Sequence, residues 1–102
     1  MKKYRVMLNG KNFKINSDGK LEKFGFYTTR WVQADNPQEA ELKAVSLVRE
    51  DKSLKASICN ESSDPPVIYL DELTEIDSFD GINVPGAGYS LYPDEDNKES
   101  QS

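Results

Sequence analysis

The chain contains no histidine and a single cysteine, Cys59. Without histidine it lacks the commonest general base, the Ser-His and Cys-His nucleophile pairs, and the usual ligand for transition metals. One cysteine cannot form an internal disulfide or a thiolate cluster. An enzyme built from this sequence would have to work through carboxylates, Lys or Tyr. We therefore expect a protein that is not an enzyme and that needs no metal or cofactor.

Long hydrophobic runs are also missing. No stretch of about 18 apolar residues occurs, and the first ten residues, MKKYRVMLNG, lack the apolar core and cleavage site of a secretory signal. These absences predict no membrane span and a cytoplasmic location. With 102 residues, of which 36% are hydrophobic, the chain has material for one thin core. We predict a single domain over residues 1–92 and a disordered acidic tail over 93–102, PDEDNKESQS.

Charge is distributed unevenly along the chain. Residues 1–33 carry eight Lys or Arg against two acids, whereas residues 71–102 carry nine acids against one Lys. In one interpretation, basic and acidic strands lie side by side in an antiparallel sheet, where each opposite-charge pair contributes about 0.2–1 kcal/mol. In the other, one face of the protein contacts an anionic partner. We favour the first interpretation, and the second stays open.

The first third of the chain has the alternating pattern of strands. Tyr4, Val6 and Leu8 alternate with more polar residues, and Asn9-Gly10 predicts a tight turn into a second strand. Ser17-Asp18-Gly19 predicts another turn. Residues 26–34 form the clearest strand, with Phe26, Thr28, Arg30, Val32 and Ala34 on one side and Tyr27, Thr29, Trp31 and Gln33 on the other.

Three signals predict a helix directly after that strand. Asn36 suits the N-cap, Pro37 suits the first helical position, and Glu39 stands where it can reach back to the cap. The apolar residues that follow recur at helical spacing and are mostly small: Ala40, Ala44, Leu47 and Val48. We predict a helix over about 37–51, with Leu54 closing over the core.

The second half of the chain predicts two further strands. Residues 60–66 form a loop, and Val67–Leu70 begins a strand that Leu73, Ile76 and Phe79 extend. Residues 84–88 predict an irregular loop, and residues 89–92 a last strand. Together these patterns predict an α+β fold: an antiparallel sheet of about four strands with one main helix packed on one face.

Two segments, one rich in acidic residues and one rich in glycine, resemble functional motifs in composition, but we interpret both as structural. The acids of residues 71–80 do not follow the spacing of a calcium loop, and we interpret them as charges that protect a strand edge from aggregation. The segment VPGAGY at residues 84–89 matches neither common phosphate-binding glycine motif. Neither segment predicts a catalytic or ligand site.

The order of strand, ADNPQEAE helix cap, amphipathic helix and returning strand resembles the strand-to-helix crossover of ferredoxin-like and related α+β sandwiches. The combination of FGFYTTRWVQAD, PPVIYLDELTEI and PGAGYSLY is similar to small bacterial proteins of unknown function. This resemblance implies a fold class and a bacterial or phage source. It implies no activity.

Binding is the function that these patterns favour. We expect the helix to cover one sheet face, and the other face or a sheet edge to meet a protein partner or a second copy, with Tyr27, Arg30 and Trp31 as the candidate surface. The alternative is single-stranded nucleic acid, because the first third interleaves basic residues with aromatic ones. A net charge of −5 makes that alternative less favoured. An acidic regulator that docks through residues 71–99 is a further possibility.

Overall fold

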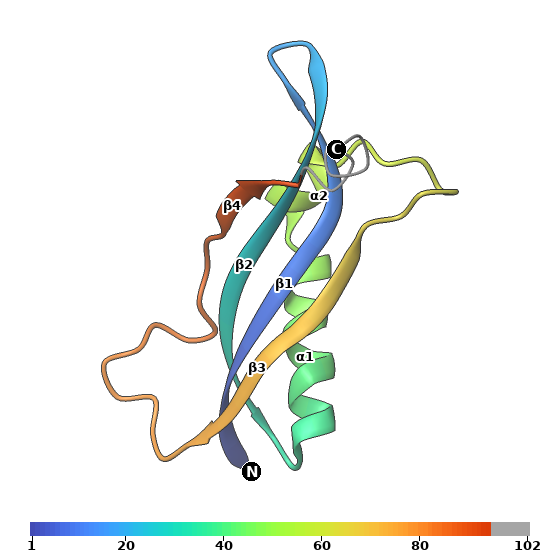
Figure 1. Cartoon of the computed structure of the whole chain (residues 1–102). Coiled ribbons are helices and arrows are strands. Elements are labelled where there is room, and N and C mark those ends of the chain that lie inside the picture. Colours follow the sequence, from blue (N-terminus) through green and yellow to red (C-terminus); the bar gives the residue numbers. More distant parts are fainter. Residues whose placement is uncertain (95–102) are drawn as a thin grey trace, which may run out of the picture.

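The computed structural model describes residues 1–94 and forms a four-stranded antiparallel sheet with two helices (Figure 1). The strands lie in the order β3-β1-β2-β4. This arrangement confirms the predicted α+β class and the number of strands. The elements are β1 (Lys2–Ser17), β2 (Lys20–Ala34), α1 (Pro37–Arg49), α2 (Lys52–Ser57), β3 (Val67–Ile76) and β4 (Ser90–Pro93).

The turn predicted at Asn9-Gly10 is wrong, because β1 continues straight through it. The chain turns at Asp18 and Gly19, which have φ values of 53° and 83°. Gly10 is needed for packing: a Cβ there would lie 2.4 Å from the ring of Phe26. Just beyond it, the pairing of β1 with β2 shifts register between Gly10 and Phe13, which is a β-bulge. The same residue types that favour a turn here accommodate an irregular strand.

A polar cluster fixes this bulge. Asn12, at a φ of 64°, donates from its side chain to Asp64 Oδ1 over 2.9 Å and from its backbone N–H to Asp94 Oδ2 over 2.8 Å. Asn60 Nδ2 donates to the Asn12 carbonyl over 2.8 Å, and its Oδ1 accepts from the backbone N–H of Lys14 over 2.9 Å. The loop of residues 60–66 is thereby tied to the hairpin of β1 and β2.

The start of α1 is as predicted, but its end is not. Glu39 donates its backbone N–H to Asn36 Oδ1 over 2.8 Å, and Glu39 Oε1 accepts from the backbone N–H of Asp35 over 2.6 Å. The helix ends at Arg49 instead of continuing to residue 51. Asp51 accepts from the backbone N–H groups of Ser53 and Leu54, so it caps the short helix α2.

The connection through α1 explains why only one face of the sheet is covered. β2 and β3 both run antiparallel to β1, so they are parallel to each other with β1 between them. Parallel strands need a crossover connection, and α1 supplies it by passing across one face (Figure 1). We call the uncovered side the open face.

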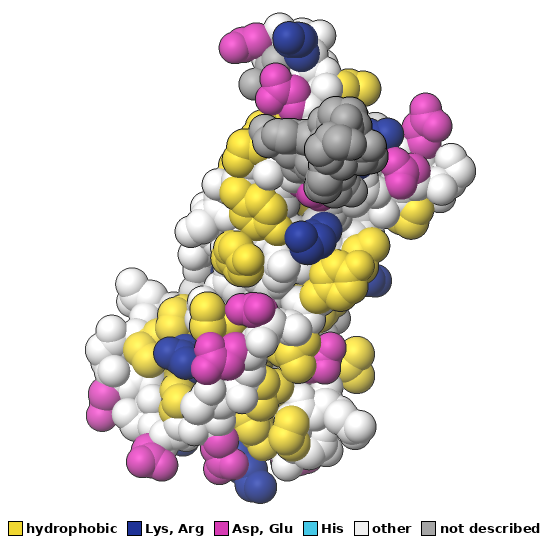
Figure 2. All heavy atoms as spheres, in the orientation of Figure 1, with side chains coloured by type: hydrophobic (Ala, Val, Ile, Leu, Met, Phe, Trp, Pro, Cys, Tyr) yellow, Lys and Arg dark blue, Asp and Glu magenta, His cyan; other side chains and the backbone are white. Residues whose placement is uncertain are grey.

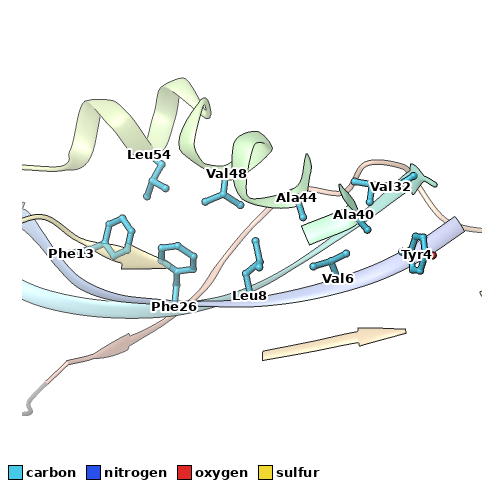
Figure 3. Packing of buried hydrophobic residues seen from close by; sticks show 11 residues of the cluster. Tyr4, Val6, Leu8, Phe13, Phe26, Val32, Ala40, Ala44, Val48 and Leu54 are labelled. Carbon is cyan, nitrogen blue, oxygen red and sulfur yellow. The ribbon is translucent and has the colours of Figure 1, made fainter. Parts of the chain in front are cut away.

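The hydrophobic core lies between the sheet and α1 (Figure 3). Ala40, Ala44 and Val48 from α1 are completely buried, and their small side chains let the helix lie close to the strands. Leu54 from α2 closes one end, as predicted, whereas Leu47 stays 37% exposed. The sheet contributes the larger side chains to this layer, chiefly Tyr4, Val6, Leu8, Phe13 and Phe26.

The two edges of the sheet differ. β3 is an edge strand that carries Asp71, Glu72 and Glu75, and its pairing with β1 contains a second bulge, between Met7 and Leu8. Charges and bulges at an edge discourage pairing with another chain. On the other side, β4 covers only Phe24–Tyr27 of β2, and further along the Trp31 backbone N–H donates to the Pro85 carbonyl over 3.0 Å. The loop of residues 77–89 therefore covers part of that edge.

The C-terminal boundary lies slightly beyond the predicted one. β4 includes Pro93, and Asp94 is buried where it accepts from Asn12. Residues 95–102, the remainder of the predicted tail, lie outside the described residues. None of the helices in the described part of the chain has the length and apolar content to cross a bilayer.

Candidate interaction surface on the open sheet face

The open face carries a row of side chains centred on Asn9. In the pairing of the strands, Asn9 stands opposite Tyr27 of β2 and also opposite Tyr69 of β3. Directly opposite residues in antiparallel strands lie on the same face, with Cβ atoms about 4.5–5.5 Å apart. The two tyrosines therefore flank Asn9 on the open face.

A third tyrosine joins this row from the last strand. The Tyr92 hydroxyl donates to Asn9 Oδ1 over 2.8 Å, and the rings of Tyr92 and Tyr27 have centroids 5.4 Å apart. Gly25 leaves the space for this ring, since a Cβ there would lie 2.3 Å from it. Tyr92 is thus held in one position. We call Tyr27, Tyr69 and Tyr92 the tyrosine cluster.

Much of the tyrosine cluster is accessible. Tyr27 is 43% exposed and Tyr69 is 50% exposed, while Tyr92 is half-buried against its neighbours. Figure 2 shows this face, with hydrophobic side chains over β2 and β4 and over β3, and a Lys or Arg side chain between them. Exposed aromatic rings on a rigid sheet offer contact area that is already ordered before a partner binds.

The central strand places cations on the same face. Lys3, Arg5 and Lys11 are separated by even numbers of residues from Asn9, so they share its side of β1. Lys11 Nζ lies 5.8 Å from the centroid of the Tyr92 ring, and the neighbouring Tyr92 raises the pKa of the Lys11 ammonium. Lys11 thus keeps its charge beside the tyrosine cluster.

Few acids of β3 oppose these cations on the open face. Glu72 lies opposite Met7 and forms an ion pair of 3.7 Å with Arg5. Glu75 instead lies opposite Tyr4, whose side chain is buried on the helix side. The contact between Arg5 and Glu72 agrees with the expectation that basic and acidic strands lie side by side, but it engages only one of the three cations.

Arg30, one of the three predicted surface residues, lies on the opposite face and is only 3% exposed. Its Nη1 donates to Thr28 Oγ1 and to the Thr29 carbonyl, and its guanidinium lies 5.2 Å from the centroid of the Tyr89 ring. A charge this deeply buried needs such partners. The prediction that Arg30 belongs to an interaction surface is therefore corrected: Arg30 packs inside the protein.

The partners of Arg30 anchor the loop of residues 77–89 to the helices. The Tyr89 hydroxyl donates to Asp51 Oδ2 over 2.6 Å. This hydrogen bond is the main cause that lowers the pKa of the Asp51 carboxyl. Burial, followed by the bond to Asp51, raises the pKa of the Tyr89 hydroxyl to about 12. Thr28 Oγ1 donates to the Gly88 carbonyl over 2.7 Å, which adds a second attachment.

Trp31, another predicted surface residue, is half-buried beneath the same loop. A Cβ at Gly86 would lie 2.9 Å from the Trp31 ring, so the glycine is required where the loop crosses it. Trp31 also lines a groove of about 950 Å³ between α1 and this loop, together with Leu42, Leu47 and Val84. Of the predicted trio, only Tyr27 is well exposed on the open face.

Four members of this surface, Tyr69, Tyr92, Asn9 and Lys11, were not predicted to lie together. Alternation along Val67–Leu70 could have placed Tyr69 on one side of a strand, but the strand pairing that brings it beside Asn9 was not predictable. Asn9 itself has the local signature of a turn.

Within residues 1–94, no group of three His, Cys, Asp or Glu side chains is arranged to hold a metal ion.

No protein-family model matches the chain, and no curated protein or solved structure is significantly similar to it.

Proposed function

We propose that this protein is a small non-catalytic binding module whose working surface is the open face of the sheet. The observation that carries the proposal is the difference between the two faces. One face is buried by α1, while the other exposes Tyr27 and Tyr69 on either side of Asn9. Tyrosines are enriched where proteins make energetically important contacts, because they offer a large rigid ring with a polar end.

The face is a better candidate than either sheet edge. At the β3 edge, Asp71 and Glu72 place charge beside a bulge, and both features oppose the addition of another strand. At the other edge, Pro85 already accepts a hydrogen bond from β2. Because both edges are protected in this way, the side chains of the open face are the more accessible binding surface.

The charges on the open face bear on the type of partner. A symmetric dimer with the open faces in contact would bring Lys3, Arg5 and Lys11 of both copies into one interface. Like charges brought together in an interface cost several kcal/mol, and this cost disfavours such a complex. A second copy is therefore the less favoured occupant, and a partner with negative charge is favoured.

A photo-cross-linking amino acid placed at Tyr69 in the full chain tests the surface and does not require the partner to be identified beforehand. Leu42 provides the matched control, because it is 68% exposed but lies on α1, on the covered side. We expect adducts from Tyr69 and few from Leu42 when the protein is irradiated in cells. Adducts from Leu42 alone would contradict the proposal and would move the binding surface to the groove between α1 and the loop.

A further inference from the structure

We propose that the open face binds single-stranded nucleic acid, with bases stacked on the tyrosine cluster and phosphates close to Lys11. This inference rests on the proposed function, since it names the class of partner for the same surface. Proteins that hold single strands combine aromatic rings that stack on bases with cations that follow the backbone. The open face presents both components.

The spacing of the rings suits separate bases. Tyr27 and Tyr69 lie on strands to either side of β1, so two strand spacings, about 10 Å, separate them. Tyr27 is 43% exposed and Tyr69 is 50% exposed, so each can offer part of its surface to a different base. Stacking on an aromatic side chain contributes about 1–3 kcal/mol per base. Two such contacts contribute about 2–6 kcal/mol in total, to which phosphate contacts add.

Asn9 and Tyr92 add order to the centre of this row. Asn9 Oδ1 accepts from the Tyr92 hydroxyl, so the side-chain amide has its acceptor engaged and its N–H groups as the remaining donors. Amide donors are suited to the carbonyl oxygens of bases. Tyr92 packs against Tyr27 and over Gly25, so the side chains of this row are already ordered in the free protein. Binding then costs less conformational entropy.

Lys11 is the cation best placed for a phosphate. It is two residues from Asn9 along β1, which corresponds to about 7 Å, and it lies over the Tyr92 ring. Arg5 lies further along the strand and is paired with Glu72. Lys3 Nζ lies 6.0 Å from the centroid of the Phe79 ring. We therefore expect Lys11 to contact the ligand, and Arg5 and Lys3 to contribute a longer-range attraction.

The net charge of −5 is not concentrated on the open face, because one of the three acids of β3 lies on the helix side and another is paired with a cation. Glu75 occupies a position on the helix side, Glu72 is engaged by Arg5, and Asp71 stands unpaired in the bulge between Leu70 and Glu72. Double-stranded nucleic acid, whose base faces are hidden in the stack, offers the tyrosines nothing to contact. The surface should therefore distinguish single strands from duplexes.

The test is fluorescence anisotropy with the full chain and labelled ten-nucleotide strands of U and of dT, together with a duplex of the same length. We expect both single strands to bind at about 50 mM salt and the duplex to bind much more weakly. One or two phosphate contacts on a single strand predict that log affinity falls with log salt concentration at a slope of about −0.7 to −1.4. A preference for U over dT would indicate contacts with the ribose 2′-hydroxyl or exclusion of the thymine 5-methyl group, the two features by which these strands differ.

Variants connect the binding to the surface. Tyr69→Ala should weaken binding by about 5-fold or more, as expected for the loss of one stacked base, whereas Tyr69→Phe should keep most of the affinity. Lys11→Gln should weaken binding and make the salt slope less steep. Lys55→Gln, on α2 and exposed, removes the same charge away from the open face and should have a smaller effect. Circular dichroism confirms that each variant is folded.

Three outcomes would overturn the inference: no binding of either strand at about 50 mM salt, equal binding of the duplex, or equal affinities for Tyr69→Ala and Tyr69→Phe. Protein adducts from the cross-linker at Tyr69, combined with no oligonucleotide binding, would identify a protein as the partner. That result would retain the open face as the working surface, so the failure of the inference is distinguishable from failure of the proposed function.

Discussion

The Tyr92 hydroxyl of β4 donates a 2.8 Å hydrogen bond to Asn9 Oδ1 of β1, and so joins two strands that are separated by β2. β4 has only four residues and lies at an edge, so its ladder of backbone hydrogen bonds is short. The side-chain bond supplements that ladder and fixes the position of the Tyr92 ring on the open face.

Removing this bond should loosen β4 without removing the ring. We expect Tyr92→Phe to lower the free energy of unfolding by about 0.5–1.5 kcal/mol, the usual contribution of one such hydrogen bond. Urea denaturation followed by circular dichroism measures the change. Tyr69→Phe is the matched control, because Tyr69 is 50% exposed and its hydroxyl should contribute little. An equal loss in both variants would indicate that the bond between Tyr92 and Asn9 does not stabilise the fold.

Gly10 and Gly25 should respond differently to the same substitution. A Cβ at Gly10 would lie 2.4 Å from the Phe26 ring, which is fully buried, so Gly10→Ala should destabilise the protein by about 1–3 kcal/mol. A Cβ at Gly25 would lie 2.3 Å from the ring of Tyr92, which is half-buried at the surface, so its displacement disturbs less packing than that of Phe26. We expect Gly25→Ala to be the milder change in thermal unfolding. The reverse order would contradict the packing of Phe26 over Gly10.

The fold and the candidate surface differ in how far the sequence determines them. The start of α1 was predictable because Asn36, Pro37 and Glu39 act within a few residues of one another. The turn predicted at Asn9-Gly10 is wrong because this dipeptide favours a turn locally, while the packing of Phe26 on Gly10 involves residues 16 positions apart. Local signals therefore indicate the elements, but they do not always indicate their ends.

The surface was harder to predict because it depends on which strands become neighbours. Alternation placed Tyr27 and Arg30 on opposite sides of one strand, as observed, yet it could not show which side α1 would cover. Arg30 is buried by Tyr89, a residue 59 positions later. Likewise, Tyr69 and Tyr92 reach Tyr27 only through the pairing of β3 and β4 with the first hairpin. Such contacts have no local signature.

The buried position of Arg30 leads to a prediction that separates stability from binding. Arg30→Met retains an apolar side chain of similar length but removes the donors to Thr28 and Thr29. Hydrogen bonds from a charged group contribute about 1.5–3 kcal/mol, so we expect the free energy of unfolding to fall by an amount in this range. The folded variant should keep its affinity for single strands, because Arg30 does not reach the open face. A selective loss of affinity with unchanged stability would contradict this assignment.

The raised pKa of the Tyr89 hydroxyl predicts that the folded protein loses stability at alkaline pH. This pKa is raised from 10.0 to about 12 in the folded protein, by burial and by the hydrogen bond to Asp51. A group whose pKa is higher when folded contributes stability fully below its unfolded pKa and loses it as pH rises. We expect unfolding to become easier between about pH 10 and pH 12. Urea midpoints across this range should fall less in Tyr89→Phe than in the unmodified chain, and parallel curves would contradict the prediction.

Removal of residues 95–102 should strengthen the binding of single strands. This segment contains Glu95, Asp96 and Glu99 against Lys98, and it follows Asp94, which is bonded to Asn12 on β1. Deleting it removes net negative charge from the chain, which should increase the attraction for a polyanion most strongly at low salt. The measurement is oligonucleotide anisotropy at about 50 and 200 mM salt, conditions that separate weakly and strongly screened charge. A control that retains the length but replaces the three acids by Gln should show a gain at least as large, because it keeps the positive charge of Lys98 that the deletion removes. Higher affinity after deletion but not after neutralisation would indicate an effect of the segment other than its charge.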